Sequence, residues 1–167
     1  MRNPASIQCP QLREMVQEAI LKDYHFSPLA EESKQQAGEA REREISHWLS
    51  GLSGVPWAEE KALRKRGLAK TPDFVLEVPI AISFGPSCGP FTGWRTINWI
   101  ESKASFGSES MHKRVLAEQL HAYHNRYGPG LVIYWGGHVK EINDQDRSII
   151  ASDRLPESVQ TIASVYL

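Results

Sequence analysis

Hydrophobic residues recur with a helical period in the first third of the chain. In residues 11–22 they stand three or four positions apart, which predicts an amphipathic helix. These positions are Leu12, Met15, Val16, Ala19 and Ile20. Ser27 followed by Pro28 is typical of a helix cap and first turn, so a second, long helix is expected from there to about Leu52. A short basic helix is expected over residues 57–66, closed by Gly67.

The hydrophobic period changes to two from Phe74 onward, which predicts a strand with one strongly apolar face. The apolar positions are Phe74, Leu76, Val78, Ile80 and Ile82. Pro79 within this strand indicates an edge position or a bulge. Residues 83–95 are rich in Gly, Pro and Ser, so we expect a long hairpin loop before a second strand at about 96–104.

The remaining elements complete an α/β pattern. A helix is expected from about 109 to 127, and residues 131–135 form a short apolar run typical of a buried central strand. The tail predicts a strand near 148–152 and a short helix after Pro156. Together the elements predict an α/β domain, a mixed sheet flanked by helices, over residues 28–167, with an N-terminal helical extension over residues 1–27.

Composition narrows the class of protein. The 167 residues are 41% hydrophobic and 23% charged, ordinary values for a globular protein. No apolar run is long enough to cross a bilayer, and the start lacks the apolar core of a signal peptide, so we expect an intracellular protein without a membrane partner. Cys9 and Cys88 could pair in an oxidising compartment, but two free thiols in a reducing interior are the simpler interpretation.

Candidate catalytic residues lie on the two predicted strands that follow residue 70. Asp73 stands at the start of the first strand, and Glu101 and Lys103 lie on the second. Because residues two apart on a strand point to the same face, Glu101 and Lys103 project together. The alternative is a strand-edge aspartate and a solvated surface ion pair, which would have little energetic value.

An acidic helical segment precedes these strands. Glu42 lies three residues before Ile45 and seven before Leu49, so it shares their inward stripe, whereas Glu44 lies off it. Helical phase therefore favours Glu42 as a fourth member of the site.

These residue types suit phosphodiester hydrolysis, which needs a nucleophilic water, stabilisation of negative charge and protonation of the leaving oxygen. Mg²⁺ prefers hard oxygen ligands and keeps several waters, so two or three carboxylates are enough to hold it. Lys103 could orient or deprotonate the water, or stabilise charge on the phosphate.

Net charge bears on this hypothesis in two ways. The formal value of −1 counts against a purely electrostatic nucleic-acid binder, but not against a nuclease whose active-site carboxylates a metal neutralises. Positive charge is local instead, beside the proposed site, at Lys61, Arg64, Lys65, Arg66 and Lys70. A solvated helix face is the usual explanation for such a cluster.

The chain resembles the PD-(D/E)xK nuclease superfamily at Glu42, Pro72-Asp73 and Glu101-Ser102-Lys103, followed by a helical glutamine. Residues 38–45 (GEAREREI) are similar to the first helix of archaeal Holliday-junction resolvases in that superfamily. A closer resemblance is to the codanin-interacting nuclease family, the TPD-domain proteins. It is carried by residues 70–74 (KTPDF), 99–107 (WIESKASFG) and 125–135 (NRYGPGLVIYW) and covers the chain from about residue 20.

The resemblance implies a restriction-endonuclease-like fold of αβββαβ type and a Mg²⁺- or Mn²⁺-dependent nuclease. The metal ligands that it implies are Asp73, Glu101, Glu42 and the backbone carbonyl of Ser102. Lys103 would be the catalytic lysine, and Gln119 would be the helical glutamine that supports the site.

The resemblance also implies partners and a location. We expect nucleic acid as the substrate, with DNA favoured and structured or branched forms included, and a codanin-like protein as a partner. A nuclear and cytoplasmic location follows from the same resemblance. Compared with the family pattern, the chain is expected to lack much of the N-terminal helical region. The number of metal ions, and whether a homodimer assembles two sites, stay open.

Weaker alternatives come from histidines and tryptophans. His121 and His124 lie three apart on a predicted helix with His112 nearby, a spacing that can bind a transition metal, but surface histidines are the commoner outcome. Trp99 and Trp135 are expected in the core.

Two functions remain: an active metal-dependent nuclease, and a nuclease-fold module that binds a codanin-like protein with weak or no cleavage. The complete set of acids with a lysine favours the first, because a scaffold gains nothing from clustering them.

Overall fold

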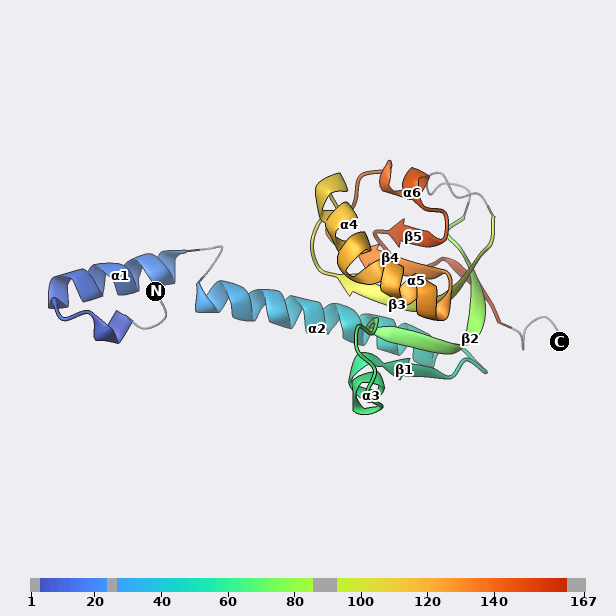
Figure 1. The fold of residues 1–167 in the computed structure, drawn as a ribbon, viewed down its shortest axis with the longest axis horizontal. Helices are drawn as coiled ribbons and strands as arrows, with labels where there is room; N and C mark the ends of the chain where they lie inside the picture. The colour runs from blue at the N-terminus through green and yellow to red at the C-terminus, as the bar shows by residue number, and fades with distance from the viewer. Residues whose placement is uncertain (1–3, 24–26, 86–92, 162–167) are drawn as a thin grey trace. The chain divides into compact units, whose positions relative to one another are not determined.

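A computed structural model shows the fold of the chain (Figure 1). It describes residues 4–23, 27–85 and 93–161. The chain divides into two compact units, Met1–Ala40 and Arg41–Leu167. Within the described ranges, no helix combines the length and the apolar character that a bilayer span requires.

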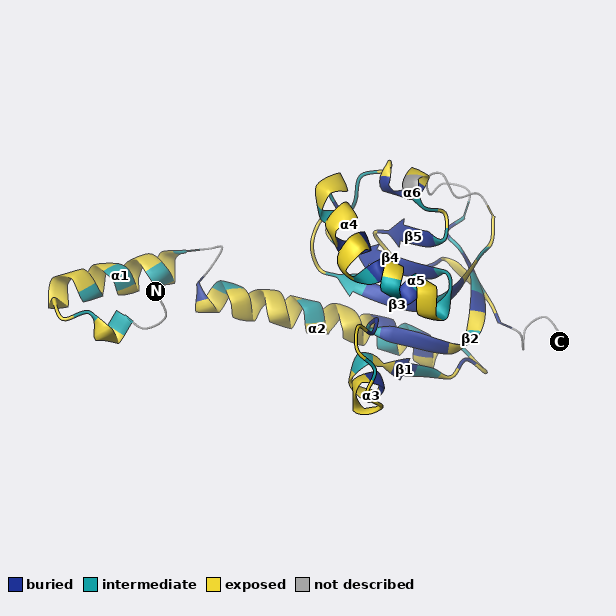
Figure 2. Cartoon of the chain, viewed as in Figure 1, coloured by how far each residue is buried: buried dark blue, intermediate teal, exposed yellow. Residues whose placement is uncertain are grey.

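The first unit is helical, as the sequence predicts. Its elements are the short 3-10 helix η1 (Pro4–Ser6), α1 (Pro10–Lys22) and the first part of α2 (Pro28–Ser50). The Ser27 hydroxyl accepts a hydrogen bond from the N–H of Ala30 at 3.0 Å, so it caps α2 as expected. None of the 13 residues of α1, all of them described, is buried (Figure 2).

The larger unit is built on a six-stranded mixed sheet. Its elements after α2 are β1 (Trp57–Glu59), α3 (Glu60–Lys65), β2 (Phe74–Ser83), β3 (Arg95–Lys103), α4 (Glu109–Val115), the π-helical turn η2 (Leu116–Leu120), α5 (His121–Tyr127), β4 (Gly130–Tyr134), α6 (Ile142–Gln145), β5 (Ile149–Ser152) and β6 (Ser158–Gln160). The strand order is β1-β2-β3-β4-β5, and β6 pairs with β2. Strands β3, β4 and β5 are parallel, and the other pairs are antiparallel. The predicted fold class, a mixed sheet flanked by helices, is confirmed.

Helices pack on both faces of the sheet, because successive strand residues point to opposite sides. On one face, Ile100 joins a core that Ile45 and Leu49 of the last turns of α2 complete, as their predicted stripe requires. On the other face, Trp99 packs in a second core with Leu120 of the α4-η2-α5 segment. The strands between these layers are largely buried (Figure 2).

A close approach between β3 and β4 fixes the strand that carries the candidate site. A Cβ atom at Gly130 would lie 2.0 Å from the Trp99 ring, so only glycine fits there. Trp99 Nε1 also donates a hydrogen bond to the Gly128 carbonyl at 2.8 Å. Trp99 is therefore a core residue, as expected, and it holds β3 against the start of β4.

Several local predictions can be compared with the elements observed. The β2–β3 register shifts between Val75 and Ile80, which is the bulge that Pro79 indicated. Residues 57–59 form β1 rather than the start of a helix, since they pair with β2. The prediction of a helix after Pro156 is wrong for residues 158–160. They form the strand β6, which pairs with β2. The predicted hairpin loop lies partly outside the described residues.

The cysteines are only partly described. Cys9 is a free, exposed thiol, and Cys88 lies outside the described residues.

Candidate active site

Asp73 is tied to the middle strands of the sheet at the start of β2. Its Oδ2 accepts a hydrogen bond from the N–H of Ser102 at 2.7 Å. Its own N–H donates to Glu101 Oε2 at 3.3 Å. Thr71 and Pro72, which precede it, are both buried. The aspartate is thus anchored in a turn that is itself packed into the domain.

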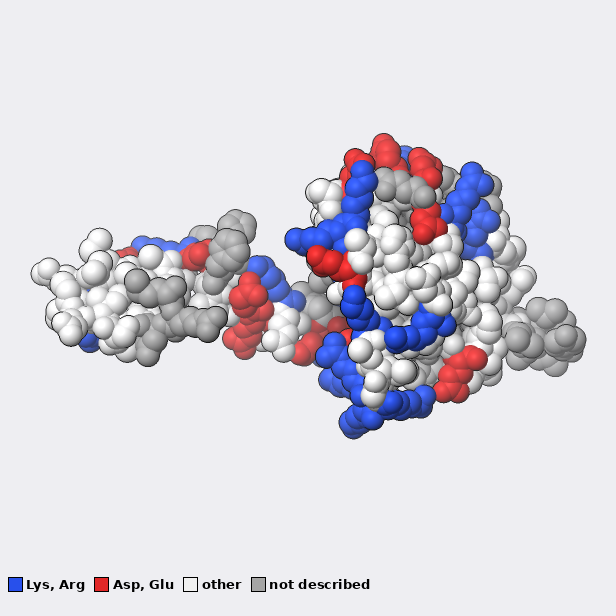
Figure 3. Space-filling model, in the orientation of Figure 1, with Lys and Arg blue, Asp and Glu red and all other residues white. Residues whose placement is uncertain are grey.

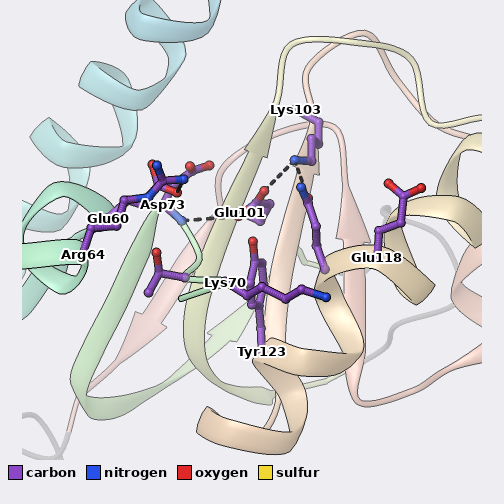
Figure 4. A pocket seen from close by; sticks show the side chains of 10 residues that line it. Glu60, Arg64, Lys70, Asp73, Glu101, Lys103, Glu118 and Tyr123 are labelled. Carbon is purple, nitrogen blue, oxygen red and sulfur yellow. Dashed lines mark hydrogen bonds and ion pairs between the residues drawn. The ribbon is translucent and has the colours of Figure 1, made fainter. Parts of the chain in front are cut away.

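Glu101 and Lys103 project from the same face of β3, as strand parity predicts. Lys103 Nζ donates hydrogen bonds to Glu101 Oε1 at 2.5 Å and to Gln119 Oε1 at 3.0 Å (Figure 4). Gln119 comes from η2 on the helical layer above that face. Glu101 is only 4% exposed, so this ion pair is largely shielded from solvent. The interpretation as a solvated surface pair is therefore wrong.

Burial dominates the acidity of both carboxyl groups. It raises the pKa of Asp73 to about 8, with the charges of Glu101 and Glu42 acting in the same direction and the Ser102 N–H and Lys103 acting against it. Burial also raises the pKa of Glu101, although the charge and hydrogen bond of Lys103 oppose the shift. Two carboxyl groups that resist ionisation thus stand beside one another.

These groups open into a cavity of about 420 Å³. Its lining residues are Glu60, Arg64, Lys70, Thr71, Asp73, Glu101, Lys103, Glu118, Gln119 and Tyr123 (Figure 4). Four of the residues that the sequence singles out for the site therefore share one cavity: Asp73, Glu101, Lys103 and Gln119. Ser102 joins them through its backbone.

Glu42 lies at the margin of this group. Its side chain is exposed, so the prediction that Glu42 shares the inward stripe of Ile45 and Leu49 is wrong. It is also absent from the cavity lining, but its charge raises the pKa of Asp73. Glu44, in contrast, pairs with Arg41 at 2.8 Å. Of the two helical glutamates, Glu42 is the one whose charge acts on the candidate site.

Several lining residues are missing from the sequence-based set. Arg64 and Lys70 belong to the predicted basic cluster, and Lys and Arg side chains gather over α3 (Figure 3). Glu60 forms an ion pair with Arg64 at 2.7 Å. Their i,i+4 spacing in the sequence could have predicted this pair. Tyr123 looks like a core residue in the sequence. It is buried, yet it borders the cavity, and burial together with the charge of Glu101 raises the pKa of its hydroxyl, which stays protonated.

The donor set fits a hard divalent cation held partly by water. Asp73 and Glu101 supply two carboxylates, and no group of three His, Cys, Asp or Glu side chains that could hold a metal occurs within residues 4–23, 27–85 and 93–161. The N–H of Ser102 points to Asp73, and the N–H and C=O of one strand residue point to the same edge, so its carbonyl faces that edge too. A bound cation would compensate the negative charges of Asp73 and Glu101, which are unfavourable in this poorly solvated position.

The histidines do not form a competing centre in the part of the chain that the structure describes. His112 is buried rather than on the surface, and its Nδ1 lies 2.9 Å from the Tyr134 hydroxyl. Burial, followed by the charge of His138, lowers the pKa of His112 to about 4, so the ring is neutral at ordinary pH. His121 is exposed, as expected for a surface histidine.

Sequence comparison supplies the family. The profile of a family described as proteins of unknown function with a TPD sequence motif matches residues 8–155. The chain belongs to this TPD family. The letters T-P-D stand in this chain at Thr71, Pro72 and Asp73, the turn that anchors the candidate site. The resemblance to TPD-domain proteins is confirmed.

Curated relatives carry a common name. The chain is 38% identical over 165 residues to CDAN1-interacting nuclease 1 of Xenopus tropicalis, covering 98% of this chain and 51% of that protein. It is 35% identical over 163 residues to the Homo sapiens protein of the same name, covering 97% of this chain and 54% of that protein. The chain thus spans about half the length of the curated relatives that it matches. No solved structure matches it.

Proposed function

We propose that the chain is a metal-dependent nuclease that hydrolyses phosphodiester bonds of nucleic acid, with DNA, including structured or branched forms, as the favoured substrate. One observation carries the proposal. Asp73 is half-buried beside the buried Glu101, and burial raises the pKa of each carboxyl group. Lys103 alone cannot neutralise two carboxylates, whereas a divalent cation at this position would compensate the second charge.

The residues then have distinct roles. Asp73, Glu101 and the Ser102 carbonyl would hold Mg²⁺ or Mn²⁺, and Glu42 would add negative charge at the margin. When bound, such an ion polarises a phosphoryl oxygen and makes water more acidic. Asp73 has to release its proton before it can act as a ligand, because its pKa of about 8 keeps it largely protonated at neutral pH.

Lys103 is the group most suited to act on the reacting atoms. Its ammonium is fixed between Glu101 Oε1 and Gln119 Oε1, so it loses little freedom when it binds a further oxygen. From this position it would orient the attacking water or stabilise negative charge on the phosphate. Gln119 is a positioning residue, since it acts through Lys103.

Two lines of comparison support the same function. The relatives from Xenopus tropicalis and Homo sapiens are named nucleases. The positions Asp73, Glu101, Ser102 and Lys103 also carry the residue types of the PD-(D/E)xK motif.

The proposal is tested by cleavage of branched, flapped and single-stranded DNA and RNA with Mg²⁺ or Mn²⁺. Asp73→Ala and Lys103→Ala should each lower the rate by about 10²- to 10³-fold. Asp153→Ala and Lys113→Ala are matched controls on exposed residues and should stay within about two-fold of wild type. Equal rates in wild type and both site variants would overturn the proposal.

The names of the relatives also favour a second candidate function. They describe proteins that interact with CDAN1, so this chain would bind a codanin-like protein and cleave weakly or not at all. A folded wild-type chain that cleaves no substrate but binds codanin would support this function. In that case Asp73→Ala should leave binding of the partner unchanged, because the Asp73 carboxylate is half-buried and lies in the cavity with Glu101 and Lys103.

A further inference from the structure

Lys70 is the cation lining the cavity whose side chain has no hydrogen-bond or ion-pair partner among the described residues. Arg64 pairs with Glu60 at 2.7 Å, and Lys103 is bound to Glu101 and Gln119. The Lys70 ammonium makes no hydrogen bond or ion pair with any described residue, yet its side chain lines the same cavity. In Figure 4 it extends from its loop toward the helical segment that carries Glu118 and Tyr123.

The backbone of Lys70 adopts an unfavourable conformation. Its φ is +51°, and it is the one non-glycine residue with positive φ among those described. In the left-handed region a Cβ atom crowds the neighbouring carbonyl oxygen, so lysine is rare there, whereas Asn and Gly are common. Such residues persist where surrounding contacts hold them, and they concentrate at functional sites.

The contact that holds this backbone comes from α5. Arg126 Nη1 donates hydrogen bonds to the carbonyl of Ala69 at 2.9 Å and to the carbonyl of Lys70 at 3.4 Å. On the other side of Lys70, Thr71 and Pro72 are buried. The left-handed residue is thus clamped between a guanidinium group and the buried turn that leads to Asp73.

We propose that Lys70 binds a backbone phosphate of the nucleic acid at the cavity, and that Arg126 is the positioning residue that holds Lys70 in place. This inference rests on the proposed nuclease function. The acidic groups of the site repel a polyanion, and Lys103 is engaged by two acceptors. A lysine ammonium without a partner is a point charge that suits a phosphate oxygen.

The first test measures binding of a fluorescein-labelled flapped DNA duplex to the full chain in chelator, at several salt concentrations. Lys70→Asn removes the charge but tolerates the left-handed backbone, and Lys70→Arg keeps the charge. Loss of one phosphate contact should weaken binding about five-fold at 0.15 M salt and reduce the slope of log K against log salt by about 0.7–0.9. Lys70→Arg should retain most of the slope.

Lys65→Asn is the matched control. Lys65 belongs to the same basic cluster, but it does not line the cavity. It should leave the slope unchanged, and a loss equal to that of Lys70→Asn would overturn the assignment to Lys70. In cleavage with Mg²⁺, Lys70→Asn should raise KM by about the same factor as it raises Kd and leave kcat unaltered.

A double-mutant cycle tests Arg126. If Arg126 acts through Lys70, Arg126→Gln weakens binding in the wild-type background and has no further effect in Lys70→Asn. Additive losses would overturn the positioning role, because they would mean that Arg126 contacts the DNA itself.

The outcomes separate this inference from the proposed function. A wild-type chain that neither binds nor cleaves the duplex overturns both. A wild-type chain that cleaves the duplex, with Kd, KM and salt slope unchanged in Lys70→Asn, overturns the role of Lys70 alone.

Discussion

Asp73 and Asp146 both accept hydrogen bonds from the backbone, yet their environments act on them in opposite directions. Asp73 Oδ2 accepts the N–H of Ser102 at 2.7 Å, but burial and the charge of Glu101 outweigh that bond and raise its pKa. Asp146 Oδ1 accepts both the N–H of Ser148 at 2.8 Å and its hydroxyl at 2.5 Å. Burial acts to raise the pKa of Asp146 too, but these bonds and nearby histidine charges prevail and lower it.

The difference separates a carboxylate that stabilises the fold from one that does not. Asp146 is half-buried, as Asp73 is, but it closes a local turn in which Ser148 donates two hydrogen bonds to its carboxylate, so its charge is satisfied. Asp73 is anchored in a buried turn beside a second carboxyl group, so its charge destabilises the fold unless a cation joins it. Groups that are held in such unfavourable environments are candidates for function.

Removing the Asp73 charge should give the largest stability effect. Its folded pKa of about 8 exceeds the ordinary 3.8, so its contribution to stability is fully present below about pH 4 and is lost as pH rises through about 8. In chelator at alkaline pH, Asp73→Asn should raise the free energy of unfolding by roughly 2 kcal/mol, or about 4–8 °C in Tm. Thermal unfolding of wild type and Asp73→Asn from about pH 4 to alkaline pH measures the difference in stability between them.

Two features make this prediction specific to a metal site. The gap should close at about pH 4, where wild-type Asp73 is protonated and resembles asparagine. Adding Mg²⁺ at alkaline pH should stabilise wild type and not Asp73→Asn, since only the ionised carboxylate of wild type can bind the cation. A wild type more stable than the variant in alkaline chelator would contradict the account.

The helical glutamates should give the next largest effect. Glu42→Gln removes negative charge that would attract the cation at the margin of the site, and it should lower the rate of cleavage about ten-fold, as changes around metal ligands commonly do. This loss should outweigh the easier ionisation of Asp73, whose pKa the Glu42 charge raises. Glu44→Gln is the matched control two residues away, where the side chain pairs with Arg41, and it should leave the rate within about two-fold. Steady-state cleavage of one flapped substrate measures both, and equal losses would mean that helical phase does not select between them.

Local pattern predicted the main elements of this fold because each one buries a periodic face. Ile45 and Leu49 lie on the predicted stripe of α2 and are fully buried. Strand parity placed Glu101 and Lys103 on one face of β3, where they form an ion pair. The signal was strong in these cases, since the spacing of residues alone determines which side chains share a face.

The missed features depend on contacts between distant residues. The strand β1 is too short to show a period and exists because Trp57 and its neighbours pair with β2. The left-handed backbone of Lys70 is held by Arg126, 56 residues away, and nothing in the local sequence requires it. Lys70 could be named within a basic cluster, but its position in the cavity could not be predicted from the sequence.

Asp146 should give the smallest effect, with the opposite dependence on pH. Its folded pKa is lowered, so its stabilisation is present above the ordinary carboxyl pKa and is lost as pH falls through the folded value. Because the group is partly exposed, Asp146→Ala should lower the free energy of unfolding by only about 0.5–1 kcal/mol at neutral pH. Urea unfolding of both proteins at neutral and acidic pH measures the difference, which should shrink in acid.

Cleavage should be unaffected in Asp146→Ala, since Asp146 does not line the cavity. A loss of activity like that of Asp73→Ala would mean that carboxylates outside the cavity matter as much as those within it, and the contrast between the two aspartates would then have no functional meaning.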